Sequence, residues 1–168
     1  MVNERITEKA VDLLCRLIEV PSISHEETAV VDLLQDYMQN ELGLEVHRSG
    51  NNLWSVQPNF APEKQTLLLN AHIDTVKPVA GWQRNPFKAT REGSRIYGLG
   101  SNDDGASLVS LLHVFAALKE EGLLHAGWMV EVDDAHVLSV DGDRCHSSLR
   151  DLVAVEVDAG THEAEGHT

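Results

Sequence analysis

The chain has 168 residues, 42% of them hydrophobic and 24% charged, a balance typical of a soluble globular domain. Its formal net charge of −14 argues against nucleic acid or an anionic membrane as a partner. No stretch is apolar enough for a membrane span, and the first residues lack the apolar core of a signal peptide, so we expect a cytoplasmic protein. Cys15 and Cys145 are expected to be free thiols, although a disulfide between them stays open.

Two amphipathic helices are expected at the start of the chain. The spacing of apolar residues predicts the first over residues 7–20, where Pro21 stops it. Ser24 and Glu27 have the spacing of a capping box, which predicts that a second helix begins there. Gly43 is expected to end that helix.

Short strands follow these helices. Residues 44–47 and 53–56 predict a hairpin joined by the turn at residues 49–52. Trp54 is expected in the core or on the sheet surface. The stretch at residues 75–93 is predicted to be a long loop, and loops of that length are usually functional or mobile.

Between the hairpin and the loop, an apolar run from residue 66 predicts a buried strand that ends near His72 and Asp74. Strand residues two apart point to the same face, so these side chains can meet at the carboxyl end of a sheet. Open α/β sheets bind ligands outside that end. A neutral imidazole there can bind zinc and a carboxylate can fix its tautomer. The pair alone is explained better by a strand-end histidine beside a helix-capping aspartate.

A second acidic position follows the short predicted strand at residues 95–97. The glycine-rich turn at residues 98–105 precedes a helix with a regular apolar face. A dinucleotide-binding turn would need a glycine or alanine where Asp103 stands, and a phosphate site has no use for two carboxylates. A nucleotide-binding loop is therefore rejected, and a divalent metal suits this turn better.

Several short motifs occur in an order that resembles a known family. They are Ala71–Val76, Gly81–Trp82, Asn85–Phe87, Tyr97–Gly100 and Asp103. The set resembles the dizinc amidohydrolases and peptidases that include acetylornithine deacetylase, succinyl-diaminopimelate desuccinylase, aminoacylase-1 and carboxypeptidase G2. It covers about residues 5–121. Acetylornithine deacetylase-like members look closest, because they share the turn at residues 21–24. Leu99 departs from the arginine that the family prefers.

The resemblance implies roles for single residues and two zinc ions per chain, with cobalt as a possible substitute. His72 would bind one zinc, Asp74 would act in catalysis by orienting that imidazole, and Asp103 would bridge both metals.

Further roles are implied at the ends of two later strands. After the predicted strand at residues 128–132 the family has two glutamates, and here Asp133 would be the general base and Asp134 a metal ligand. Asp158 would be the terminal carboxylate ligand of the other zinc. The alternative that these acidic residues only form turns stays open. Family members continue through a dimerisation domain to a last metal-binding histidine. That domain is absent from the 168 residues, so a homodimer is not expected.

The alternation of helices and strands predicts an α/β fold. The resemblance implies a three-layer αβα sandwich with a mixed central sheet, as one catalytic-type domain over residues 1–160 with a polar tail at residues 161–168. The expected function is zinc-dependent hydrolysis of the amide bond of a small-molecule N-acyl amino acid, as in acetylornithine deacetylase of arginine biosynthesis. Two alternatives stay open. One is a non-catalytic or truncated relic that binds metal weakly or serves as a packing domain, and the other is a di- or carboxypeptidase of the same family.

Overall fold

The computed structural model describes residues 4–61, 67–124 and 128–133, where helices alternate with strands. The elements are α1 Glu4–Ile18, α2 Thr28–Asp36, the π-helical turn η1 Tyr37–Glu41, β1 His47–Ser49, β2 Asn52–Val56, β3 Leu67–His72, β4 Thr90–Glu92, β5 Arg95–Tyr97, α3 Gly105–Glu120 and β6 Trp128–Asp133. None of the helices in these ranges combines the length and apolar character that a membrane crossing requires.

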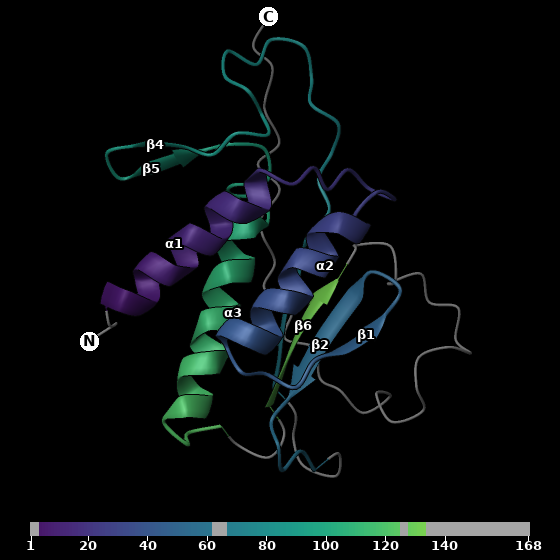
Figure 1. Cartoon of the computed structure of the whole chain (residues 1–168), viewed down its shortest axis with the longest axis vertical. Helices are drawn as coiled ribbons and strands as arrows, with labels where there is room; N and C mark the ends of the chain where they lie inside the picture. The colour runs from purple at the N-terminus through teal and green to yellow at the C-terminus, as the bar shows by residue number, and fades with distance from the viewer. Residues whose placement is uncertain (1–3, 62–66, 125–127, 134–168) are drawn as a thin grey trace, which may run out of the picture.

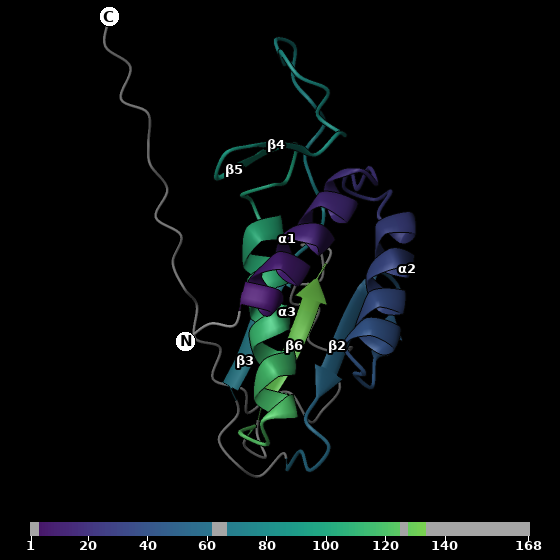
Figure 2. The ribbon, with the colours of Figure 1, turned by 60° about the vertical axis from the view of Figure 1, so that its left-hand side comes forward.

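Four strands form a mixed sheet in the order β1-β2-β6-β3 (Figure 1). β2 is antiparallel to both β1 and β6, whereas β6 is parallel to β3. Helices α1, α2 and α3 lie on the same face of this sheet (Figure 2). The predicted α/β fold with a mixed sheet is therefore confirmed. Within the described ranges helices cover this one face, so the second helical layer of the expected sandwich is not among them.

The core lies between the sheet and the helices. Side chains along a strand alternate between the two faces, so every second strand residue joins the core. The buried strand residues of the core are Leu53, Ala71, Val130 and Val132, and the half-buried Leu69 packs against them. They belong to one apolar cluster with helix residues that include Leu13, Leu17, Leu34, Leu112 and Phe115. This packing anchors β3 up to its last residues and so determines where His72 leaves the sheet.

The segment between α1 and α2 differs from the prediction. α1 begins and ends slightly earlier than expected. The capping box is wrong, because α2 begins at Thr28 and no side chain caps its first turn. Ser24 instead donates a hydrogen bond to Asp74 on the strand side of the molecule. A tertiary partner has thus replaced the local one that the spacing suggested.

The strands largely follow the prediction. β1 and β2 form the expected antiparallel hairpin, although β1 begins at His47, where the predicted strand ended. Trp54 lies half-buried on the sheet surface and stacks on the His47 ring at a centroid distance of 5.6 Å. The stretch predicted as a loop contains β4, which pairs with β5 in a separate ribbon. Three residues without apolar alternation carry no strand signal, so the sequence could not indicate β4.

Some predictions concern residues outside the described ranges. These are Cys145, Asp134, Asp158 and the polar tail at residues 161–168. Cys15, which is described, is a free thiol in α1.

One buried polar pair joins η1 to α3. The Nδ1 atom of His113 donates to the carbonyl oxygen of Val109 at 2.7 Å, so Nε2 accepts the hydrogen bond of the Tyr37 hydroxyl at 2.9 Å. Burial lowers the pKa of His113 below 6.5, more than its bond to Val109 raises it. Burial also raises the pKa of Tyr37 to about 12, with the charge of Glu41 adding to the effect. Both groups are therefore neutral in the folded protein at pH 7, and His113 has a structural role.

This pair predicts a loss of stability in mild acid. Below pH 6.5 the unfolded chain protonates His113 while the folded chain does not, so the free energy of unfolding falls as the pH drops. The slope from this one group is at most about 1.4 kcal/mol per pH unit, and it levels off below the folded-state pKa. Urea unfolding between pH 7.5 and 5 measures it. The slope should shrink in His113→Gln and persist in a control, His25→Asn, at an exposed histidine. An equal slope in all three proteins would contradict the assignment.

Candidate metal centre

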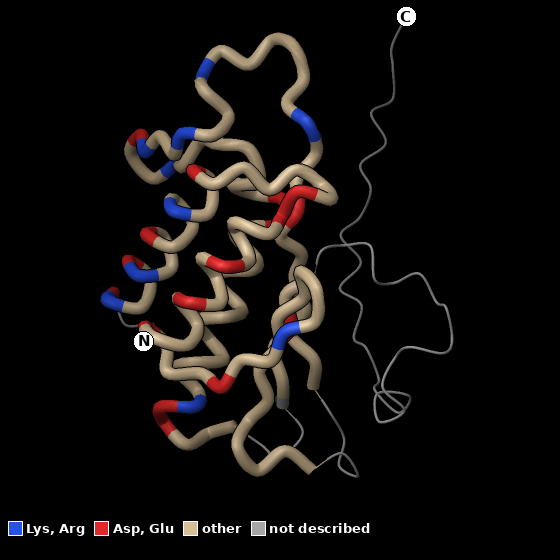
Figure 3. The backbone as a smooth tube through the Cα atoms, turned by 45° about the vertical axis from the view of Figure 1, so that its right-hand side comes forward, with Lys and Arg blue, Asp and Glu red and all other residues tan. Residues whose placement is uncertain are grey.

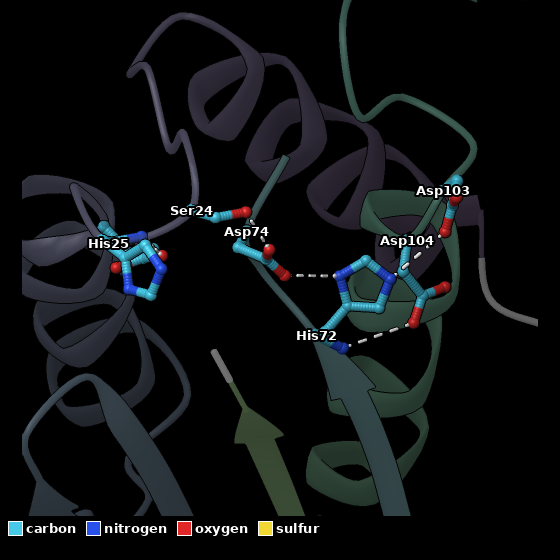
Figure 4. A network of polar contacts seen from close by, with 7 residues as sticks. Ser24, His25, His72, Asp74, Asp103 and Asp104 are labelled. Atoms are coloured by element: carbon cyan, nitrogen blue, oxygen red, sulfur yellow. Dashed lines mark hydrogen bonds and ion pairs between the residues drawn. The ribbon is translucent and has the colours of Figure 1, made fainter. Parts of the chain in front are cut away.

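The candidate site lies at the carboxyl end of the sheet. His72 is the last residue of β3, and Asp103 and Asp104 immediately precede α3. Figure 4 shows the His72 ring between Asp74 on one side and Asp103 on the other. Residues from a strand end and from the turn before a helix thus meet at one edge, as the sequence predicted for His72, Asp74 and Asp103.

Each nitrogen of the His72 ring faces a carboxylate. The Nδ1 atom lies 3.1 Å from Oδ1 of Asp74, and the Nε2 atom lies 3.2 Å from Oδ1 of Asp103. The two carboxylates differ in exposure, since the side chain of Asp74 is 12% exposed and that of Asp103 is 90% exposed. Asp74 is therefore held inside the protein, while Asp103 can bind something that arrives from solvent.

The carboxylates also set the charge of the imidazole. Burial lowers the pKa of His72, but the hydrogen bond with Asp103 and the charges of Asp104 and Asp74 outweigh it, so the pKa is raised overall above 6.5. The same negative groups that stabilise a proton on this ring would stabilise a metal cation in its place. Acidic residues elsewhere are spread along the described chain (Figure 3), so most of the net charge is not concentrated at this site.

The donor set fits a divalent metal in part. Two ligand atoms of a tetrahedral zinc, each about 2.0–2.2 Å from the metal, lie about 3.4 Å apart. The 3.2 Å between His72 Nε2 and Asp103 Oδ1 is close to that separation. With Asp74 bound at Nδ1, the ring presents Nε2 as the metal-binding nitrogen. Among residues 4–61, 67–124 and 128–133, no three side chains form a complete metal-binding group. A full site would need donors from outside these ranges.

Asp104 is a neighbour that the sequence did not single out. Its Oδ2 atom accepts a hydrogen bond from the backbone N–H of His72 at 3.4 Å. This bond links the start of α3 directly to the end of β3. The doublet of aspartates in the glycine-rich turn was the available signal, but spacing alone could not tell which of the two would face His72.

A pocket of about 300 Å³ opens beside these residues, close to the lower limit for small-ligand sites. Its lining includes His72, Asp74, Asp103, Val76, Trp82 and Leu99. Val76 and Trp82 belong to the stretch at residues 75–93 that the sequence predicted to be a long loop. Both side chains are exposed, so this stretch forms an accessible apolar rim around the pocket.

The later acidic candidates are placed only in part. In the parallel register of β3 and β6 the partner of His72 is Asp133. The backbone of the proposed general base therefore lies at the same sheet edge as the His72 backbone. Asp134 and Asp158, the other proposed ligands, lie outside the described residues.

Comparisons with known proteins agree with this arrangement. Residues 68–132 match Peptidase family M20/M25/M40. A succinyl-diaminopimelate desuccinylase from Novosphingobium aromaticivorans is 30% identical over 153 residues, covering 77% of this chain and 40% of that protein. An N-fatty-acyl-amino acid synthase/hydrolase from Mus musculus is 30% identical over 130 residues, covering 69% of this chain and 25% of that protein. The M20 family metallo-carboxypeptidase Sso-CP2 from Sulfolobus solfataricus matches with a TM-score of 0.61 at 25% identity, covering 74% of this chain and 30% of that chain.

The fold is thus an α/β fold of the kind found in M20 metallopeptidases. Residues 68–132 belong to Peptidase family M20/M25/M40, which confirms the family resemblance seen in the sequence. The chain spans 40% or less of the length of these relatives. None of the three names is acetylornithine deacetylase, so that finer specificity stays a prediction.

Proposed function

We propose that this chain forms part of a zinc-dependent amidohydrolase that cleaves the amide bond of an N-acyl amino acid. The observation that carries the proposal is the placement of His72 between Asp74 and Asp103, with each ring nitrogen within 3.2 Å of a carboxylate oxygen. The family match over residues 68–132 supports the same class of reaction. The name of the Novosphingobium relative, a desuccinylase, is consistent with an N-acyl substrate.

The described residues have separate tasks in this proposal. Asp74 accepts the Nδ1 hydrogen of His72 and so keeps Nε2 directed at the metal. The exposed Asp103 offers two carboxylate oxygens, which suits a bridging ligand. Bound zinc would polarise the scissile carbonyl and lower the pKa of a coordinated water. Trp82 and Val76 at the rim would contact the apolar part of the substrate.

Asp133 is proposed as the general base, and Asp134 and Asp158 as further ligands. The strand register beside His72 supports the position of Asp133. An aspartate is one methylene shorter than the glutamate that the family has there, so the water it activates would have to sit closer to the backbone. The same departure favours the second candidate function, a non-catalytic relic that binds metal weakly.

The identity of the acyl group in the substrate is the finer part of the proposal. The shared turn at residues 21–24 favours an acetylornithine-like substrate, whereas the similarity to several succinyl-diaminopimelate desuccinylases favours a succinylated one. A dipeptide is the third option, which the carboxypeptidase among the structural relatives supports. All three present an amide next to an amino acid carboxylate, so one assay can compare them.

Metal analysis followed by hydrolysis assays tests the proposal. The full chain, purified without chelator and supplied with zinc, should hold about two zinc ions. It should release amine from N-acetylornithine, N-succinyl-diaminopimelate or a dipeptide. Chelation should abolish turnover, and zinc or cobalt should restore it. Metal binding without turnover on any of these substrates would favour the relic, and no metal binding at all would overturn the proposed site.

A further inference from the structure

The hydrogen bonds around Asp74 continue into the segment between α1 and α2. The hydroxyl of Ser24 donates to Oδ2 of Asp74 at 2.6 Å, while Oδ1 faces His72 (Figure 4). Two backbone bonds hold this segment against the strand end. The Ser24 N–H donates to the Thr75 carbonyl at 3.1 Å, and the Thr75 N–H donates to the Ser22 carbonyl at 2.8 Å. Hydrogen bonds from Ser24 and His72, which belong to two separate parts of the chain, thus hold the Asp74 carboxylate.

Further hydrogen bonds, through the buried Glu27, hold the turn that presents Ser24. His25 has a φ of +76°, in the left-handed region that side chains other than glycine rarely adopt. Its backbone N–H donates to Oε1 of Glu27, and Oε2 of Glu27 accepts a hydrogen bond from the Asn51 side chain at 2.9 Å. Glu27 is 1% exposed, so water has little access to replace these bonds. A buried carboxylate therefore ties the turn to the β1–β2 hairpin.

We propose that Ser24 is a positioning residue for His72, and that Glu27 and Asn51 hold Ser24 in place. The inference rests on the proposed function, since it assigns His72 to a metal. The last side-chain torsion of an aspartate is soft, so one hydrogen bond leaves the carboxylate free to rotate. The Ser24 hydroxyl on Oδ2 removes that freedom and keeps Oδ1 aimed at Nδ1. The ring then presents Nε2 in one orientation.

The alternative is that the Ser24 hydroxyl only satisfies a buried carboxylate. Both roles predict some loss of stability on removal of the hydroxyl, so stability cannot decide. The orientation role alone predicts weaker metal binding and an altered ligand geometry. A spectroscopic readout of a bound metal therefore separates the two.

Cobalt titration of the full chain provides that readout. In Ser24→Ala the Co²⁺ and Zn²⁺ affinities should fall about tenfold, because removing partners of a metal-ligating histidine typically costs 10–100-fold and this one acts through Asp74. The visible absorption bands of bound Co²⁺ should shift as well. Ser24→Thr keeps a hydroxyl and should restore both properties. Ser110→Ala, which removes a hydroxyl bonded to Ala106 on the exposed side of α3, is the matched control.

A second variant extends the test to the hairpin. Asn51→Ala removes the side chain that holds Glu27. In the described part of the chain the hydrogen-bond partners of Asn51 are Glu27 and Thr28, neither of which belongs to the metal site. Asn51→Ala should lower Co²⁺ affinity severalfold. Asn40→Ala, at an exposed asparagine bonded to Asp36, should not. If the parent binds Co²⁺ and both Ser24→Ala and Asn51→Ala keep its affinity and spectrum, the inference is overturned while the proposed function stands. If the parent protein binds neither Co²⁺ nor Zn²⁺, the inference and the proposed function both fail. Should Ser24→Ala not fold, Asn51→Ala decides alone.

Discussion

Replacing His72 with alanine should reduce the zinc content from about two ions per chain to one or none. His72 supplies the nitrogen donor of the candidate site and Asp103 the oxygen donor beside it, while Asp74 orients the ring from its other nitrogen. Without the ring the carboxylates would still attract cations. Asp103 Oδ1 would, however, lose the nitrogen donor that now lies 3.2 Å from it. Zinc analysis after gel filtration measures the change, and amide hydrolysis should be lost with the metal.

The comparison needs a histidine variant that leaves the site intact. His113→Gln removes an imidazole buried between η1 and α3, where its partners are Tyr37 and Val109. It should keep the parent zinc content while losing some stability. If His72→Ala also keeps the parent content, His72 is not a ligand and the candidate site must be abandoned.

Gly105→Ala should weaken the fold and the metal site together. A Cβ atom there would lie 2.5 Å from the carbonyl oxygen of Gly100 and 2.8 Å from Cδ1 of Leu14. The first of these atoms belongs to the backbone of the turn, so the turn itself must move. Overpacking of this kind costs about 1–3 kcal/mol, which exceeds the gain of up to about 1 kcal/mol from replacing glycine within a helix.

The movement would reach the metal site because the turn carries Asp103 and Asp104. We therefore expect a lower urea midpoint and a loss of zinc affinity of about tenfold or more, as for other changes that displace metal ligands. Ser107→Ala, an exposed position in the first turn of α3, is the matched control and should change neither quantity. A Gly105→Ala variant with parent affinity would show that the position of this turn does not govern metal binding.

The family match and the geometry around His72 are separate observations that support the same metal site. The match over residues 68–132 includes most of β3, the glycine-rich turn, α3 and most of β6. Ser24, Glu27 and Asn51 lie before it, yet their hydrogen bonds lead to Asp74 within it. The positioning of His72 thus depends on parts of the chain that the matched segment does not include.

Much of the site could be predicted because its rules are local. Residues two apart on a strand share a face, so His72 and Asp74 were expected together, and their side chains are in contact. A glycine-rich turn between a strand and a helix placed Asp103 at the same edge. The order of strands and helices likewise indicated an α/β fold, which the mixed sheet confirms.

The tertiary structure alone decided which partners each polar group took. Ser24 has the local spacing of a helix cap, yet it binds Asp74, a residue 50 positions away. Asp104 accepts a hydrogen bond from the His72 backbone across 32 positions, a contact that the sequence did not predict. Local periodicity determines the direction of a side chain relative to its own helix or strand. Contacts between distant segments depend on how the apolar faces of those helices and strands pack, and that is settled only when the core forms.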